Sequence, residues 1–389
     1  MNKNLWLLIV AQGLFLTNNV TFIAINGLVG LSLAPAPWMA TLPVMGYVVG
    51  GALSTGLVAR VQSRFGRKAS FLSGLVVALV SALLCAVAVW SHQFGLLVAA
   101  TLLAGYYSAN GQLYRFAAAE IAAPGGRDKA VSWVMAGGLL GAIVGPNLAK
   151  YGRNAMEAPF VGAYLALAVV ALLSMAAVSA MRFAVPAGPI ATPAPSRQLA
   201  QIVGQPVFVV AALGSALSYG VMNLLMAATP LAMQVCGLPF DDAALVLQWH
   251  VIGMFAPGFF TGHLIQRFGL LKIMATGVVL NLLCIGIALG GIDLHRFLLA
   301  LFLLGVGWNF LFTASTSLAL RAYRPEEKDQ AQAAINFGVF ATMTVTSFAS
   351  GALVTTQGWH WLNLGSLLPV AITAAAIAWL AWHQRPAKA

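Results

Sequence analysis

Ser63-Arg-Phe-Gly-Arg-Lys68 and Gln266-Arg-Phe-Gly-Leu-Leu-Lys272 are the two stretches that decide the fold of this chain. Each joins one long apolar segment to the next, and each places basic residues around an Arg-Phe-Gly step. A second related pair, Pro124-Gly-Gly-Arg-Asp-Lys-Ala130 and Pro325-Glu-Glu-Lys-Asp-Gln-Ala331, follows at the corresponding place in each half. Two halves with the same order of segments are typical of two-domain membrane transporters built from parallel repeats.

The composition agrees with a membrane protein. Of 389 residues, 60% are apolar and only 7% are charged, against roughly 25% charged residues in soluble domains. Apolar stretches of about 20 residues, long enough to cross a hydrocarbon core of ~30 Å, recur from end to end. We therefore predict an all-α polytopic fold. Its twelve predicted spans are residues 5–27, 39–59, 69–90, 94–114, 130–149, 160–182, 205–228, 243–264, 270–290, 297–319, 331–354 and 360–382.

A linker separates the two predicted halves. Pro186-Ala-Gly-Pro-Ile-Ala-Thr-Pro-Ala-Pro-Ser196 has no hydrophobic period and is typical of an extended connection. The predicted domains are an N-terminal six-helix bundle over residues 1–183, a cytoplasmic linker over 184–204 and a C-terminal six-helix bundle over 205–389. The N-terminus runs straight into the first span without a cleavage site, so we expect that span to be retained.

The net charge of +11 would suggest nucleic-acid binding in a soluble protein. In a polytopic protein the distribution of charge is more informative, because Lys and Arg gather in cytoplasmic loops. All but three of the 20 basic residues fall on one side of the predicted membrane, the exceptions being Lys150, Arg153 and Arg296. This asymmetry predicts that both termini are cytoplasmic. It also makes the lipid bilayer, and no nucleic acid, the expected partner.

The loop after the second span resembles the motif G-x-x-x-D-R-x-G-R-K of the major facilitator superfamily. The matching residues are Arg64, Gly66, Arg67 and Lys68 in the first half, and Gly262, Arg267 and Gly269 in the second. Ala59, Ser63 and Gln266 stand where the family has glycine and aspartates. The resemblance implies two six-helix bundles, with the matching residues gating the cytoplasmic side.

Two pairs of side chains are candidates for a soft metal site. Met222 and Met226 lie four residues apart in the seventh predicted span, and His250 and Met254 do so in the eighth. Residues four apart share one face of a helix. Because consecutive spans run in opposite directions, Met226 is expected near the depth of His250. Thioethers and imidazole favour monovalent copper, and an ionisable residue inside a span is a functional hypothesis by default.

These pairs resemble those of the CcoA-like copper importers, the CalT family, which have M-x-x-x-M in span seven and H-x-x-x-M in span eight. The resemblance implies an alternating-access importer in a bacterial inner membrane that carries cuprous copper into the cytoplasm and supplies cbb3-type cytochrome oxidase assembly. Copper would then be the transported substrate, with no permanent cofactor, and periplasmic or cytoplasmic copper carriers would be partners. Met233 and Cys236, between the two pairs, could capture the metal first.

Other functions remain open on these residues. His250 could be a packed, hydrogen-bonded imidazole in a carrier of a small organic solute, such as riboflavin or a drug-like compound. Polar residues in other spans could line a cavity for such a solute or join helices through hydrogen bonds. They are Asn18, Asn19, Asn26, Asn110, Gln112, Trp308 and Asn309. An enzyme is not expected, because no carboxylate or nucleophile lies at the depth of His250, and the absence of G-x-x-x-x-G-K-[ST] excludes an ATP-driven pump.

Overall fold

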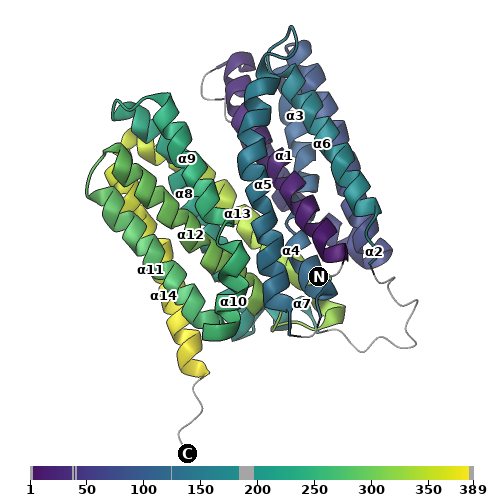
Figure 1. The fold of residues 1–389 in the computed structure, drawn as a ribbon, viewed down its shortest axis with the longest axis vertical. Coiled ribbons are helices and arrows are strands. Elements are labelled where there is room, and N and C mark those ends of the chain that lie inside the picture. Colours follow the sequence, from purple (N-terminus) through teal and green to yellow (C-terminus); the bar gives the residue numbers. More distant parts are fainter. Residues whose placement is uncertain (1–2, 37–38, 40–41, 124, 184–196, 385–389) are drawn as a thin grey trace, which may run out of the picture. The chain divides into compact units, whose positions relative to one another are not determined.

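The computed structural model describes residues 3–36, 39, 42–123, 125–183 and 197–384, and long helices dominate it (Figure 1). Among these residues, nine helices are long and apolar enough to cross a membrane. Each of the twelve predicted spans overlaps a described helix, with ends that differ by several positions. Residues 40 and 41 of the second predicted span lie outside the described residues. The prediction of an all-α polytopic fold is therefore confirmed.

The described residues divide into two compact units. Unit 1 consists of Met1–Pro124, Gly137–Ser196 and Gln332–Phe340, as far as they are described. Its helix α2 packs against α3 and α6, and α1 packs against α6. Phe22, Tyr47 and Tyr164 form part of the core, together with Cys85, which is fully buried as an ordinary core residue. The helices introduced here are α1 (Lys3–Leu33), α2 (Leu42–Trp90), α3 (Phe94–Gly111), α4 (Tyr114–Ile121), α5 (Arg127–Arg153) and α6 (Val161–Ser179). The part of α5 up to Ala136 belongs to unit 2.

Unit 2 consists of Gly125–Ala136, Arg197–Ala331 and Ala341–Ala389, as far as they are described. Its helix α12 contacts α8, α9, α10 and α11, so α12 is the scaffold of this unit. The helices from residue 199 onward are α7 (Leu199–Val203), α8 (Pro206–Val235), α9 (Phe240–Phe255), α10 (Gly258–Phe268), α11 (Leu270–Leu289), α12 (Leu294–Ala319), α13 (Lys328–Thr356) and α14 (Gly358–His383), with a short 3₁₀ turn at Pro325–Glu327. Of α13, residues Gln332–Phe340 belong to unit 1. The predicted eighth span is thus two helices, α9 and α10, because Pro257 cannot donate a helical hydrogen bond.

The repeated Arg-Phe-Gly step produces the same backbone break in both units. Gly66 has φ 82° and ψ 171°, and it divides α2 into the second and third predicted spans. Gly269 has φ 88° and ψ 157°, and it separates α10 from α11. This combination of angles is essentially open only to glycine. The glycine in the repeated stretch therefore ends one span and allows the next to begin in a new direction.

We expect Gly66→Ala to lower the free energy of unfolding by about 1–3 kcal/mol, because a side chain is strained at this positive φ. Gly56, also in α2, is the matched control. It has a helical backbone, and a Cβ added there would meet no atom within 4 Å. Since alanine is the better helix former, Gly56→Ala should be neutral or stabilising. SDS titration of the purified protein in detergent measures the unfolding free energy of both variants. If Gly66→Ala and Gly56→Ala lower it equally, the backbone conformation of Gly66 does not strain an added side chain.

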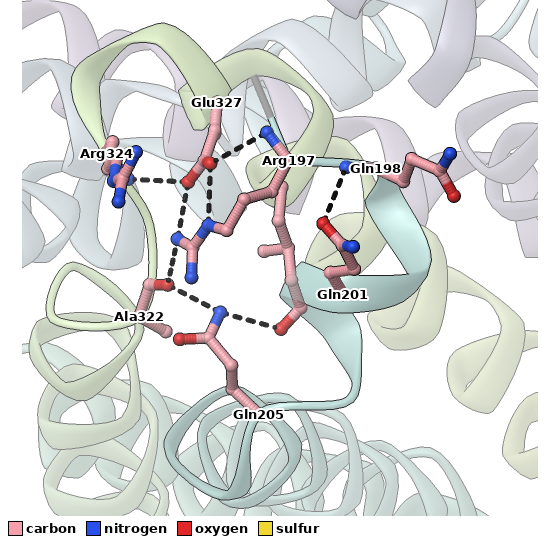
Figure 2. Close-up of polar contacts among 8 residues, drawn as sticks. Arg197, Gln198, Gln201, Gln205, Ala322, Arg324 and Glu327 are labelled. Atoms are coloured by element: carbon pink, nitrogen blue, oxygen red, sulfur yellow. Dashed lines mark hydrogen bonds and ion pairs between the residues drawn. The ribbon is translucent and has the colours of Figure 1, made fainter. Parts of the chain in front are cut away.

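Polar contacts tie the segment entering α8 to the turn between α12 and α13 (Figure 2). Arg197 Nε donates to Glu327 Oε1 at 2.7 Å, and Arg197 Nη2 donates to Oε2 at 2.6 Å. These hydrogen bonds raise the pKa of the Arg197 guanidinium above its ordinary value. Gln205 Nε2 donates to the backbone oxygen of Ala322 at 2.8 Å. The predicted linker thus ends in an ordered segment that includes α7, whereas its residues 184–196 lie outside the described residues.

Candidate functional site

His250 is fully buried in α9, and α12 holds its ring in place. Its Nδ1 lies 2.6 Å from the backbone oxygen of Leu301. Because a carbonyl oxygen can only accept, Nδ1 carries a proton, and Nε2 of the neutral ring keeps a free lone pair. Nε2 has no hydrogen-bond partner among the described residues. The geometry matches a packed, hydrogen-bonded imidazole, and it leaves one ring nitrogen free.

Met254 is buried one turn farther along α9, where the backbones of α9 and α12 meet closely. A Cβ added to Gly305 in α12 would lie 2.8 Å from Met254 N. Asn309 Nδ2 donates to the Met254 backbone oxygen at 2.7 Å, and Asn309 Oδ1 accepts from Thr261 in α10 at 2.7 Å. Asn309 therefore joins three helices through hydrogen bonds, which is one of the two roles predicted for the polar residues within spans.

Met222 and Met226 lie on α8, where Met222 is buried and Met226 is half-buried. Helices α8 and α9 contact each other, and both contact α12. The structure thus brings together the helices that carry the two predicted pairs, while the His250 ring is engaged with α12. No group of three or more His, Cys, Asp or Glu side chains in the described part of the chain could hold a metal. Metal binding by the four residues stays a prediction.

The predicted spans placed both capture residues, Met233 and Cys236, in the loop between the seventh and eighth spans. The structure places only Cys236 outside a helix. Helix α8 continues to Val235, so Met233 lies in its last turn and is fully buried. Cys236 follows the helix, is half-buried, and donates its backbone N–H to Ala232 O at 3.0 Å. The predicted span ended at residue 228, just before Pro230, whereas in the structure Pro230 lies within α8 without ending it.

An aromatic cluster, formed by Tyr219, Phe255, Trp308 and Phe312, joins α8, α9 and α12. Trp308 stacks on Phe312, with ring centroids 4.9 Å apart and an interplanar angle of 17°. Tyr219 meets both rings edge-on, at 5.4 Å from Trp308 and 5.3 Å from Phe312, and Phe255 lies 5.8 Å from Trp308. Trp308 is 1% exposed, and its Nε1 has no partner among the described residues. The cluster offers aromatic faces and one unused N–H donor.

Of this cluster, only Trp308 was singled out from the sequence. Trp308 and Phe312 are four residues apart, so their shared face was open to prediction. Tyr219 and Phe255 lie on other helices, and the chain has 39 Phe, Trp and Tyr residues in all, 21 of them phenylalanine. Among so many aromatic residues, no spacing indicates which rings meet across helices.

The amides predicted in the first half join helices within unit 1. Asn19 Nδ2 donates to the Tyr47 hydroxyl at 2.9 Å, which links α1 to α2. The Tyr164 hydroxyl donates to Asn26 Oδ1 at 2.8 Å, which links α6 to α1. Asn110 is likewise bonded to a serine of α2. For these three residues the prediction of interhelical hydrogen bonds is confirmed.

The motif at residues 64–68 contains one buried charge, Arg67, which pairs with Glu120 of α4. Glu120 lies beyond the predicted end of the fourth span, and the structure places it in helix α4. Arg67 also donates to Gln62 and, at 2.7 Å, to Gln332 Oε1. Arg67 is thus paired with an acid from another helix, while Ser63 stands where the motif has aspartate.

The other basic motif residues play different parts. Lys68 Nζ donates to the backbone oxygens of Ser179 at 2.6 Å and Met181 at 3.1 Å, so it stabilises the carboxyl end of α6. Arg64 and Arg267 are exposed, and each lies over the phenylalanine that follows it. Of the four basic residues that match the motif, Arg67 and Lys68 therefore make structural contacts, whereas Arg64 and Arg267 are exposed.

Comparison with known proteins places the chain among transporters along its whole length. A model of the Major Facilitator Superfamily matches residues 5–256 and 211–389. The chain is 39% identical over 363 residues to the riboflavin transporter RfnT of Brucella anthropi, covering 93% of this chain and 91% of that protein. It is 27% identical over 354 residues to the uncharacterized transporter YddS of Bacillus subtilis, covering 85% of this chain and 78% of that one. None of these relatives supports the resemblance to copper importers.

Solved structures agree on the fold. The human organic anion transporter MFSD10 superposes with a TM-score of 0.77 at 13% identity, covering 96% of this chain and 99% of that one. A bacterial homologue of the iron transporter ferroportin, in its outward-facing state, gives a TM-score of 0.75 at 15% identity, covering 99% and 100%. At such identities the likeness establishes a shared architecture and says nothing about cargo.

Proposed function

The chain belongs to the major facilitator superfamily and is a multi-pass membrane transport protein, not an enzyme; from this premise we propose that its cargo is riboflavin or a closely related planar solute. The observation that carries the proposal is the 39% identity to a riboflavin transporter along nearly the full length of both chains. The alternative that the sequence left open is thereby better supported than copper import.

The aromatic cluster supports the same proposal. A planar heteroaromatic ring presents a π-face, which packs well against other aromatic rings. Its carbonyl oxygens need donors, and Trp308 Nε1 is a buried donor that has no partner among the described residues. A buried polar group without a partner costs free energy. A cargo that accepts this hydrogen bond would remove that cost while it is bound.

We further propose that the protein lies in a bacterial inner membrane with both termini in the cytoplasm. All but three of its 20 basic residues fall on the side of the termini, and this bias sets orientation in polytopic proteins. Import by alternating access would follow from the superfamily architecture, with the two six-helix halves, residues 1–183 and 205–389, as the moving bodies.

The test is riboflavin uptake by bacteria that can neither make nor import the vitamin. Cells that express the protein should grow on low riboflavin and should take up labelled riboflavin at a saturable rate. Excess unlabelled riboflavin should compete, and an unrelated sugar should not. Expression without growth or uptake, with the protein shown to be in the membrane, would exclude riboflavin as cargo.

Copper remains a second candidate because of one observation at His250. Its Nδ1 is bound to a backbone oxygen, while Nε2 has no partner in the described part of the chain, and metal-bound histidines are held in this way. Cellular copper should then rise on expression and fall back with Met226→Leu, which removes a half-buried thioether at nearly constant volume. If the cells take up riboflavin and Met226→Leu changes neither riboflavin nor copper content, the metal hypothesis is wrong.

A further inference from the structure

Asn223 is a buried amide in the middle of α8, next to the aromatic cluster. Asn223 is only 8% exposed, and it lies inside a predominantly apolar helix. Tyr219 precedes it by four residues, so the two side chains lie on the same face, one turn apart. Nothing in the sequence distinguished Asn223 from the other amides.

Helix α13 fixes the orientation of this amide. Asn223 Nδ2 lies 3.0 Å from Thr346 Oγ1 and 2.9 Å from Ser347 Oγ. The Thr346 hydroxyl directs its single proton to backbone oxygens of its own helix, those of Thr342 at 3.0 Å and Met343 at 3.3 Å. Thr346 can therefore only accept from Asn223. The NH₂ group must face α13, and the amide oxygen must face away from it.

The amide oxygen accepts no hydrogen bond from the described residues, and it is not one of their fully buried unpaired oxygens. The NH₂ group of Asn223, by contrast, has three acceptors when the Met343 backbone oxygen at 3.4 Å is included. An amide oxygen in an apolar environment is stabilised by accepting a hydrogen bond. The site thus presents one fixed acceptor beside an aromatic wall.

We propose that Asn223 determines specificity by accepting a hydrogen bond from a ring imide N–H of the cargo, and that Thr346 is the positioning residue that orients it. The inference rests on the proposed function. Flavins carry such a group: the N3–H lies between two carbonyls on the pyrimidine edge of the ring. A planar solute without an N–H at this edge would leave Oδ1 unpaired and would be discriminated against.

The first experiment changes the ligand and not the protein. Binding of riboflavin and of N3-methylriboflavin to the purified full-length transporter is followed by quenching of flavin fluorescence. Methylation removes the donor, so the wild-type protein should bind the methylated ligand about tenfold or more weakly. Equal affinity for the two ligands would overturn the role of Asn223 and leave the proposed function standing. Failure to bind or transport riboflavin at all would overturn both.

Substitutions then locate the effect. Asn223→Ala should bind the two ligands with equal affinity. The matched control is Asn363→Ala in α14, because Asn363 is a buried asparagine on another helix and its Oδ1 has no partner among the described residues; it should keep the wild-type discrimination. Thr346→Val removes an acceptor for the Asn223 NH₂ group, so the amide can rotate by 180° and the discrimination between the two ligands should fall. Thr346→Ser keeps the hydroxyl and should discriminate as the wild type does. If Asn223→Ala still discriminates, the acceptor is another group.

Discussion

Replacing Trp308 by alanine should reduce riboflavin uptake to background. The Trp308 ring stacks on Phe312 and meets Tyr219 and Phe255, so it is the contact common to α8, α9 and α12. Truncating a buried aromatic side chain to alanine costs roughly 3–5 kcal/mol. Part of the loss would therefore come from unfolded protein. Initial uptake rates should be divided by the amount of folded transporter, measured by size-exclusion chromatography.

Trp308→Phe separates packing from recognition. Phenylalanine keeps an aromatic ring in the stack and removes the Nε1–H donor, so the KM for riboflavin should rise about tenfold while the protein stays folded. Trp359→Phe is the matched control: Trp359 is buried in α14, and its Nε1 also has no partner among the described residues. An unchanged KM for Trp308→Phe would show that the indole N–H does not touch the cargo.

The sequence predicted the architecture well because membrane insertion leaves a strong pattern. Spans of about 20 apolar residues indicate helices directly, since no other open structure satisfies its backbone in lipid. The repeated Arg-Phe-Gly step also marked the correct joints, at Gly66 and Gly269. The ends of helices were less predictable. Helix α8 continues through Pro230 to Val235, and two predicted spans merge into α2 because the break at Gly66 is only one residue long.

The candidate site was harder to predict, because spacing along one helix does not say which neighbour its face meets. The i, i+4 relation of His250 and Met254 correctly placed them together, yet both are engaged with α12, which lies some 50 residues later in the chain. Asn223 illustrates the same limit: its partners on α13 are more than 120 residues away. The methionine and histidine pairs matched a motif of copper importers, whereas the full-length similarity is to a riboflavin transporter.

Arg67→Gln should lower the free energy of unfolding by about 3 kcal/mol. The Arg67 side chain is 5% exposed and pairs with Glu120, which is 27% exposed. Removing one partner of a buried ion pair costs about 3–5 kcal/mol because the other charge stays desolvated. Water can reach part of Glu120, so the lower end of this range applies. SDS titration of the purified protein measures the change.

A double variant tests whether the ion pair itself is responsible. Arg67→Gln/Glu120→Gln removes both charges, so it should regain a large part of the stability that Arg67→Gln loses. The regain will be incomplete, because Gln62 and Gln332 also accept hydrogen bonds from Arg67. Arg64→Gln is the matched control, since Arg64 is an exposed arginine of the same motif, and it should change stability little. If the double variant is as unstable as Arg67→Gln, the amide contacts and not the charge pair stabilise this end of unit 1. The missing aspartate of the motif would then have no electrostatic substitute in Glu120.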